Sequence, residues 1–215
     1  MASRKVPLIT GEYYHVYNRS AHGMQLFENE REAEAFVNAV IYYSLVNPPR
    51  SLSLEKRYKE NVKDFDNCLV SILAYCVMPN HFHLLLKQEV DGGISKMMQR
   101  LTLSFVRFYN TLHKQKGPLF ESKFKSVLIE SENQLLHVSR YIHLNPTSSH
   151  LVDDPIKYPY SSFKYYVQGG EKKPLDFGDI LRSKKRQYYE KFVYDNMEYQ
   201  QALQFIKNQL LDYDN

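Results

Sequence analysis

Several kinds of residue are scarce in this chain. Among its 215 residues there is no Trp, and there are only two cysteines, Cys68 and Cys76. Both lie in an apolar stretch, so we interpret them as core residues, which excludes a disulfide framework and a cysteine-based metal site. Charged residues make up 24% of the chain and hydrophobic residues 43%, proportions that exclude a disordered protein.

Long apolar runs are also missing. The longest mostly apolar run, residues 69–78, is too short to cross a bilayer. The first seven residues, MASRKVP, have no apolar signal core. We therefore expect a cytoplasmic protein that does not bind a membrane.

The net charge is small, +4, but the basic residues are unevenly distributed. Residues 96–125 contain seven Lys and Arg residues against one acid, Glu121. A concentrated basic segment is typical of a surface that binds a phosphate backbone, although a solvated helix face explains it equally well. The candidates for DNA contact are Arg19, Arg100, Arg107, Lys123 and Lys125.

Hydrophobic periodicity predicts strands alternating with helices. The predicted strands are 13–18, 68–77, 81–87 and 120–129, and the predicted helices are 29–45, 92–114 and 132–144, the last ended by Pro146. The first six elements follow the split βαβ, or ferredoxin-like, order. We expect an α+β fold: an antiparallel sheet with helices on one face, a further helix near the other face or an edge, and a mainly helical C-terminal tail.

The same pattern predicts the organisation of the chain. Residues 50–66 are polar and charged and are interpreted as a connecting segment. Gly169–Gly170 marks a break, so we expect a domain over residues 10–166 and a helical extension over residues 167–215.

Two histidines alternate with a phenylalanine on the strand predicted at residues 81–87. Side chains of a strand alternate between faces, so His81 and His83 project from one face while Phe82 points to the other. Two imidazoles about 7 Å apart along a strand can converge on one metal ion. Such a pair alone is a weak signal, since core and surface histidines produce it too.

The last predicted helix carries Tyr141 and Asn145, which are four residues apart and therefore on one helical face. The Asn145 amide oxygen is a hard ligand that suits Mg²⁺ or Mn²⁺. A phenol on the same face can attack a phosphate that the cation polarises. Each residue also has a structural interpretation: Tyr141 is one of 18 tyrosines, and Asn145 precedes a proline at a helix end.

Together these segments resemble a known enzyme family. Residues 78–85 (MPNHFHLL) and 140–146 (RYIHLNP) are similar to the two signature motifs of HUH-type single-tyrosine transposases. Residues 14–19 (YHVYNR), 117–126 (GPLFESKFKS) and 158–162 (YPYSS) resemble further blocks of the REP-associated branch of that family. The resemblance covers roughly residues 10–166 in the expected order.

The resemblance implies a ferredoxin-like catalytic domain and a mechanism. His81 and His83, with Asn145 as third ligand, would hold a divalent metal, Mg²⁺ or Mn²⁺, and Tyr141 would be the nucleophile. The enzyme would nick and rejoin single-stranded DNA, often beside a hairpin or palindromic repeat, through a 5′-phosphotyrosine intermediate. His15 and His143 are not expected to be ligands. A homodimer is possible, and the mobile-element and domesticated roles stay open.

Two other functions compete with this prediction. One is a catalytically silent single-stranded nucleic-acid-binding protein on the same fold, which would not need His81, His83, Tyr141 and Asn145 together. The other is a small zinc hydrolase built on His81 and His83, which would need a third strong ligand and a base. Preference for Mg²⁺ or Mn²⁺ over Zn²⁺ would distinguish the transposase from the hydrolase.

Overall fold

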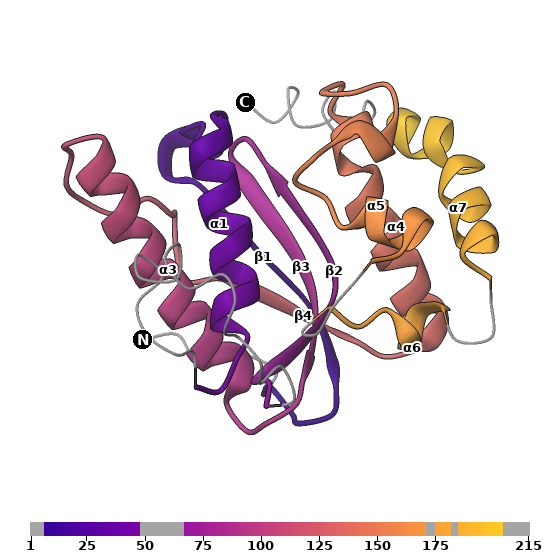
Figure 1. Cartoon of the computed structure of the whole chain (residues 1–215), viewed down its shortest axis with the longest axis horizontal. Helices are drawn as coiled ribbons and strands as arrows, with labels where there is room; N and C mark the ends of the chain where they lie inside the picture. The colour runs from indigo at the N-terminus through magenta and orange to yellow at the C-terminus, as the bar shows by residue number, and fades with distance from the viewer. Residues whose placement is uncertain (1–6, 48–66, 171–174, 182–184, 204–215) are drawn as a thin grey trace.

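The computed structural model describes residues 7–47, 67–170, 175–181 and 185–203 (Figure 1). The strands are β1 (Tyr13–Arg19), β2 (Val70–Met78), β3 (His81–Gln88) and β4 (Lys125–Ile129). The α-helices are α1 (Glu30–Tyr43), α3 (Gly93–Leu112), α4 (Glu132–Ser148), α5 (Phe163–Gln168), α6 (Gly178–Leu181) and α7 (Arg186–Tyr194), with short 3-10 helices η1 (Ala21–Gly23) and η2 (Pro155–Lys157). The connecting segment predicted at residues 50–66 lies outside the described residues.

The four strands form one sheet in the order β2-β3-β1-β4. Each neighbouring pair is antiparallel, and β3 lies between β1 and β2. This is the split βαβ arrangement, so the predicted α+β, ferredoxin-like fold is confirmed.

One face of the sheet is covered by α1 and α3, which lie side by side in Figure 1. The apolar stripe of α3 is buried, as its spacing predicts, and includes Met97, Leu101 and Phe105. Phe82 of β3 points into this layer, since its ring packs on Phe36 of α1, which in turn packs on Phe105. His81 and His83, which alternate with Phe82, therefore face the other side of the sheet.

That other side is covered in part by α4, which packs against β2, and by the elements that follow α4 (Figure 1). The outer edge of β2 is also closed by the chain. Val77 N donates to Tyr160 O (3.0 Å) and Asp176 N donates to Ile72 O (3.1 Å). This part of the sheet edge is thus protected from pairing with another chain.

Two predicted boundaries are wrong. The helix predicted to end near Leu144 continues through Pro146 to Ser148. Pro146 removes one backbone donor, but Ser149 N still donates to Asn145 O (3.0 Å) and the buried last turn is held by packing. The strand predicted from Phe120 starts only at Lys125; Phe120 makes a single bridge to Ser20.

No helix in the described part of the chain is long and apolar enough to span a membrane.

Candidate functional site

The site is built on the sheet face opposite α1 and α3. Cross-strand register pairs Arg19 with His81 and Tyr17 with His83, and the second register pairs Tyr17 with Lys125. Directly paired residues in antiparallel strands point to the same face. These five side chains come from three strands that are far apart in sequence, and they share one face.

The two histidines of β3 are held by hydrogen bonds on their Nδ1 atoms. His81 Nδ1 lies 2.7 Å from Asn80 Oδ1, and His83 Nδ1 lies 2.9 Å from His15 Nε2. The His81 and His83 rings are perpendicular, with centroids 5.0 Å apart. Outer-sphere hydrogen bonds of this kind orient imidazoles that bind a metal through Nε2.

Tyr141 lies against the histidines. It projects from α4, and its ring meets His83 edge-on at a centroid distance of 5.5 Å and His15 at 6.1 Å. Burial raises the pKa of the Tyr141 phenol above its ordinary value of 10.0, while the hydrogen bond with Asn145 and the positive charge of Arg19 lower it. The phenol is therefore protonated at neutral pH unless an additional positive charge approaches it.

Asn145 lies one helical turn beyond Tyr141 and is buried. Its Nδ2 donates to the Tyr141 carbonyl oxygen (2.9 Å), so the side-chain oxygen is the atom that would serve as a ligand. The tyrosine and the two histidines are brought together, and Asn145 lies beside the Tyr141 phenol, with which it makes the hydrogen bond that lowers the pKa of that group.

The donor set fits a divalent cation. Two oriented imidazoles and one amide oxygen suit a borderline or hard metal ion. Three protein ligands leave coordination positions of that ion open for phosphate. Across the described residues there is no cluster of three or more His, Cys, Asp and Glu side chains able to hold a metal. The third ligand predicted from the sequence, Asn145, is an amide and is not one of these four residue types.

The five candidate DNA contacts separate into two groups. Arg19 and Lys125 are exposed on the site face, and Lys123 is exposed in the loop that leads into β4. Arg100 and Arg107 project from α3, across the sheet from the site. Arg100 Nη1 donates to the Val46 oxygen (3.2 Å), just beyond the end of α1.

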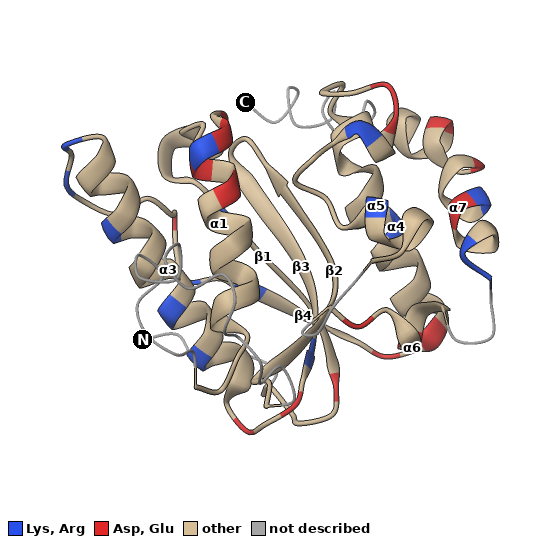
Figure 2. Cartoon of the chain, viewed as in Figure 1, with Lys and Arg blue, Asp and Glu red and all other residues tan. Residues whose placement is uncertain are grey.

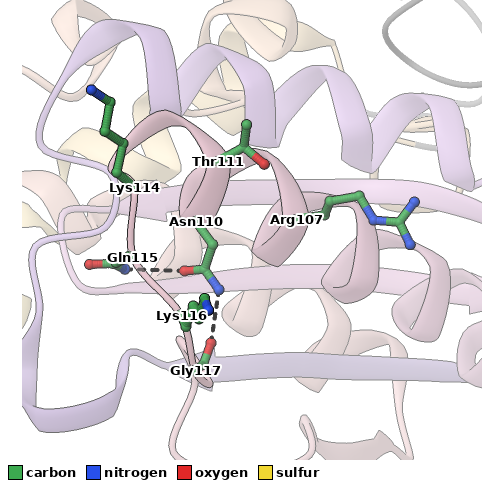
Figure 3. Close-up of a pocket in the computed structure, with 7 residues that line it drawn as sticks. All are labelled: Arg107, Asn110, Thr111, Lys114, Gln115, Lys116 and Gly117. Carbon is green, nitrogen blue, oxygen red and sulfur yellow. Dashed lines mark hydrogen bonds between the residues drawn. The ribbon is translucent and has the colours of Figure 1, made fainter.

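Arg107 lines a shallow, basic pocket at the end of α3 (Figure 3). Lys114 and Lys116 lie at the same pocket. The pocket wall is braced by Asn110, whose Nδ2 donates to Gly117 O (3.0 Å) and whose Oδ1 accepts from Gln115 Nε2 (3.2 Å). This basic surface is separate from the histidine pair.

Sequence reasoning missed two side chains of the site, Asn80 and Tyr17, and did not give His15 a role. Strand alternation over residues 13–18 places His15 and Tyr17 on one face. This alternation is the pattern from which their shared face could have been predicted. Their position beside His83 depends on the register between β1 and β3, which periodicity does not reveal.

Residues 47–145 match the family model described as IS200-like transposase. A solved structure of a REP-associated tyrosine transposase bound to a REP hairpin is 19% identical, with a TM-score of 0.57, covering 84% of this chain and 93% of that one. A bacterial tRNA(His) guanylyltransferase-like protein in complex with ATP is 13% identical, with a TM-score of 0.38, covering 88% and 93%. No curated protein matches the chain.

These comparisons confirm the resemblance predicted from the motifs. The family match spans His81, His83, Tyr141 and Asn145, and the first structural similarity shows the same fold. The matches support a transposase-like, DNA-processing function.

Proposed function

We propose that this chain, with residues 47–145 matching the IS200-like transposases, is a metal-dependent nickase and strand transferase for single-stranded DNA. The nucleophile is Tyr141, the metal ligands are His81 and His83, and Asn145 is the third ligand. The observation that carries the proposal is the 5.5 Å contact between the Tyr141 and His83 rings, made by helix α4 and strand β3.

The chemistry follows from the positions of these side chains. The Tyr141 Oη atom attacks the scissile phosphorus; an O–P bond forms to the tyrosine and the P–O3′ bond breaks. The phenol proton passes to water, and the leaving oxygen takes up a proton to become a free 3′-OH. The product is a 5′-phosphotyrosine, which a 3′-OH can attack in reverse to join strands.

Charge near the tyrosine supports its ionisation. A divalent cation held by His81 and His83 would polarise the phosphate and offset the charge that develops on it. Arg19, which already lowers the pKa of Tyr141, lies on the same face and would also contact phosphate. These positive charges oppose the desolvation that holds Tyr141 in its phenol form.

The substrate is proposed to be single-stranded DNA beside a hairpin or palindromic repeat. The solved relative is bound to a REP hairpin, and Arg19, Lys123 and Lys125 would contact the backbone near the site. Tyr141 meets the histidines of its own chain, so a homodimer is not required to assemble these three side chains.

The first test is a covalent-adduct assay. Protein is incubated with pooled, end-labelled hairpin DNA and Mn²⁺ and run on a denaturing gel. We expect a metal-dependent protein–DNA band that disappears in Tyr141→Phe and in the double variant His81→Ala/His83→Ala. The matched control is Tyr199→Phe, at an exposed tyrosine of the C-terminal region, which should retain the band.

Two results would contradict the proposal. A band that persists in Tyr141→Phe would assign the nucleophile to another tyrosine. Tight binding of the host's own repeats with no covalent band in any divalent metal would favour the catalytically silent single-strand binder.

A further inference from the structure

His15 is an ionisable side chain at the site to which the proposed mechanism assigns no role. It lies on the central strand β1, and its Nε2 is 2.9 Å from Nδ1 of His83. The two rings also stack, with centroids 5.0 Å apart and planes 26° from parallel. The contact is therefore a defined hydrogen bond and not a loose approach.

Rings on several sides fix the orientation of His15. Tyr17 packs on it at a centroid distance of 5.1 Å, and Tyr141 meets it edge-on at 6.1 Å. A side chain packed by three aromatic neighbours has few rotamers available. Its Nε2 atom is thus held in place relative to His83.

The direction of the hydrogen bond follows from the ligand role of His83. Between two neutral imidazoles one nitrogen must donate and the other must accept. An imidazole that binds a cation through Nε2 carries its proton on Nδ1. His83 Nδ1–H must then donate, and His15 Nε2 must accept. Asn80 Oδ1 is placed to do the same for His81 Nδ1–H.

We propose, on the basis of the function above, that His15 is a positioning residue that accepts a hydrogen bond from His83 Nδ1–H and so holds the tautomer and ring orientation in which His83 presents Nε2 to a divalent cation. His15 acts through His83 and is not itself a ligand. Together, Asn80 and His15 orient the two histidines of the pair.

The primary test is Mn²⁺ affinity of the full chain without DNA, measured from the free Mn²⁺ signal by electron paramagnetic resonance. His15→Leu removes the acceptor and should weaken Mn²⁺ binding about 10- to 100-fold, the usual effect of losing such a partner. His15→Gln keeps a carbonyl acceptor on a side chain of similar reach and should recover most of the affinity. A general packing defect would not be rescued in this way.

A second readout requires no metal. Histidine ¹⁵N spectra of the wild-type protein should show His83 protonated on Nδ1. The same spectra should show that tautomer lost in His15→Leu and retained in His15→Gln. Wild-type spectra with the His83 proton on Nε2 would overturn the assignment, whatever the affinity data show.

Two variants separate this inference from the proposed function. His137→Leu removes an exposed histidine from α4 and should leave Mn²⁺ affinity unchanged, whereas His83→Ala should abolish the site. If His83→Ala binds Mn²⁺ like the wild type, the proposed metal site is wrong. If His83→Ala loses binding but His15→Leu does not, only the role of His15 is wrong. If His15→Leu and His15→Gln both fail as completely as His83→Ala, His15 is a ligand and the positioning role is overturned.

Discussion

At the scale of single residues, the histidines of this protein play different parts according to what surrounds them. His143 lies two positions after Tyr141 but is fully buried and has other partners. Its Nδ1 is 2.8 Å from the Tyr189 hydroxyl and its Nε2 is 2.8 Å from Ser162 Oγ. It is a structural link between α4, α5 and α7, in line with the expectation that it is not a ligand.

Burial gives His143 a measurable effect on stability. Desolvation lowers the pKa of His143 from 6.5 to about 3. Between these pH values the unfolded chain binds a proton at His143 and the folded chain does not. Stability therefore falls as pH falls from 6.5 towards 3, by about 1.4 kcal/mol for each pH unit. At pH 5 about 2 kcal/mol of the free energy of unfolding should be lost through this residue.

Urea unfolding at pH 7 and pH 5 measures this loss. His143→Gln keeps hydrogen-bonding capacity but does not titrate, so it should lose less stability than the wild type over this range. His15, whose pKa burial lowers to about 4, contributes equally to both proteins and cancels in the comparison. An identical pH dependence in the two proteins would show that folding does not shift the pKa of His143.

At the scale of elements, the helix that carries Tyr141 is anchored by the C-terminal segments. The Tyr189 hydroxyl on α7 donates to Ser139 Oγ on α4 (2.8 Å) and also contacts His143. Gln200 Nε2 donates to the Tyr141 carbonyl oxygen (3.1 Å). These contacts show that the C-terminal region holds α4 in position. We propose that residues 167–215 form an extension of the domain over residues 10–166.

Removing one hydroxyl from α7 tests this anchoring. Tyr189→Phe leaves two buried polar atoms, on Ser139 and His143, each with one partner fewer, and should reduce the free energy of unfolding by about 1–3 kcal/mol. Tyr188→Phe, on the same helix but half exposed, is the matched control and should change it by less than about 0.5 kcal/mol. Chemical denaturation followed by circular dichroism compares the two; equal losses would mean that the network contributes nothing specific.

At the scale of the whole molecule, basic side chains lie on both sides of the sheet. Figure 2 shows Lys and Arg residues along α3, and the sequence of this helix contains no Asp or Glu. This basic helix lies across the sheet from His81 and His83, while Arg19 and Lys125 lie beside them. Basic charge is therefore offered to DNA on two separate surfaces, of which only one adjoins Tyr141.

Salt dependence of DNA binding distinguishes the two surfaces. For a hairpin with a single-stranded flank, Arg19→Ala/Lys125→Ala should lower the slope of log K against log salt by about 1.4, because each lost single-strand phosphate contact removes about 0.7. Arg107→Ala/Lys114→Ala, which removes the same charge from the far surface, should change the slope less. Fluorescence anisotropy at several salt concentrations measures both slopes; the reverse order would show that the backbone follows α3.

Much of this molecule could be predicted from local patterns. Alternation on β3 places His81 and His83 on one face, and a spacing of four places Tyr141 and Asn145 on one side of α4. The stripe of α3 predicts its buried side, and the order of elements predicts the sheet. These properties depend on residues close in sequence, for which the periods of helix and strand are sufficient.

Tertiary structure alone decided what lies beside the histidines. The register of β1 against β3 and β4 brings His15, Arg19 and Lys125 to the site, and a slip of one residue would send each to the opposite face. Packing of α4 on the open face brings Tyr141 to His83, and packing of α7 buries His143 and Tyr189. Packing also carries α4 past Pro146, where the local signal predicts an end. Such contacts join residues more than a hundred positions apart, as Tyr17 and Lys125 are, and their energies depend on surfaces that exist only after the chain has folded.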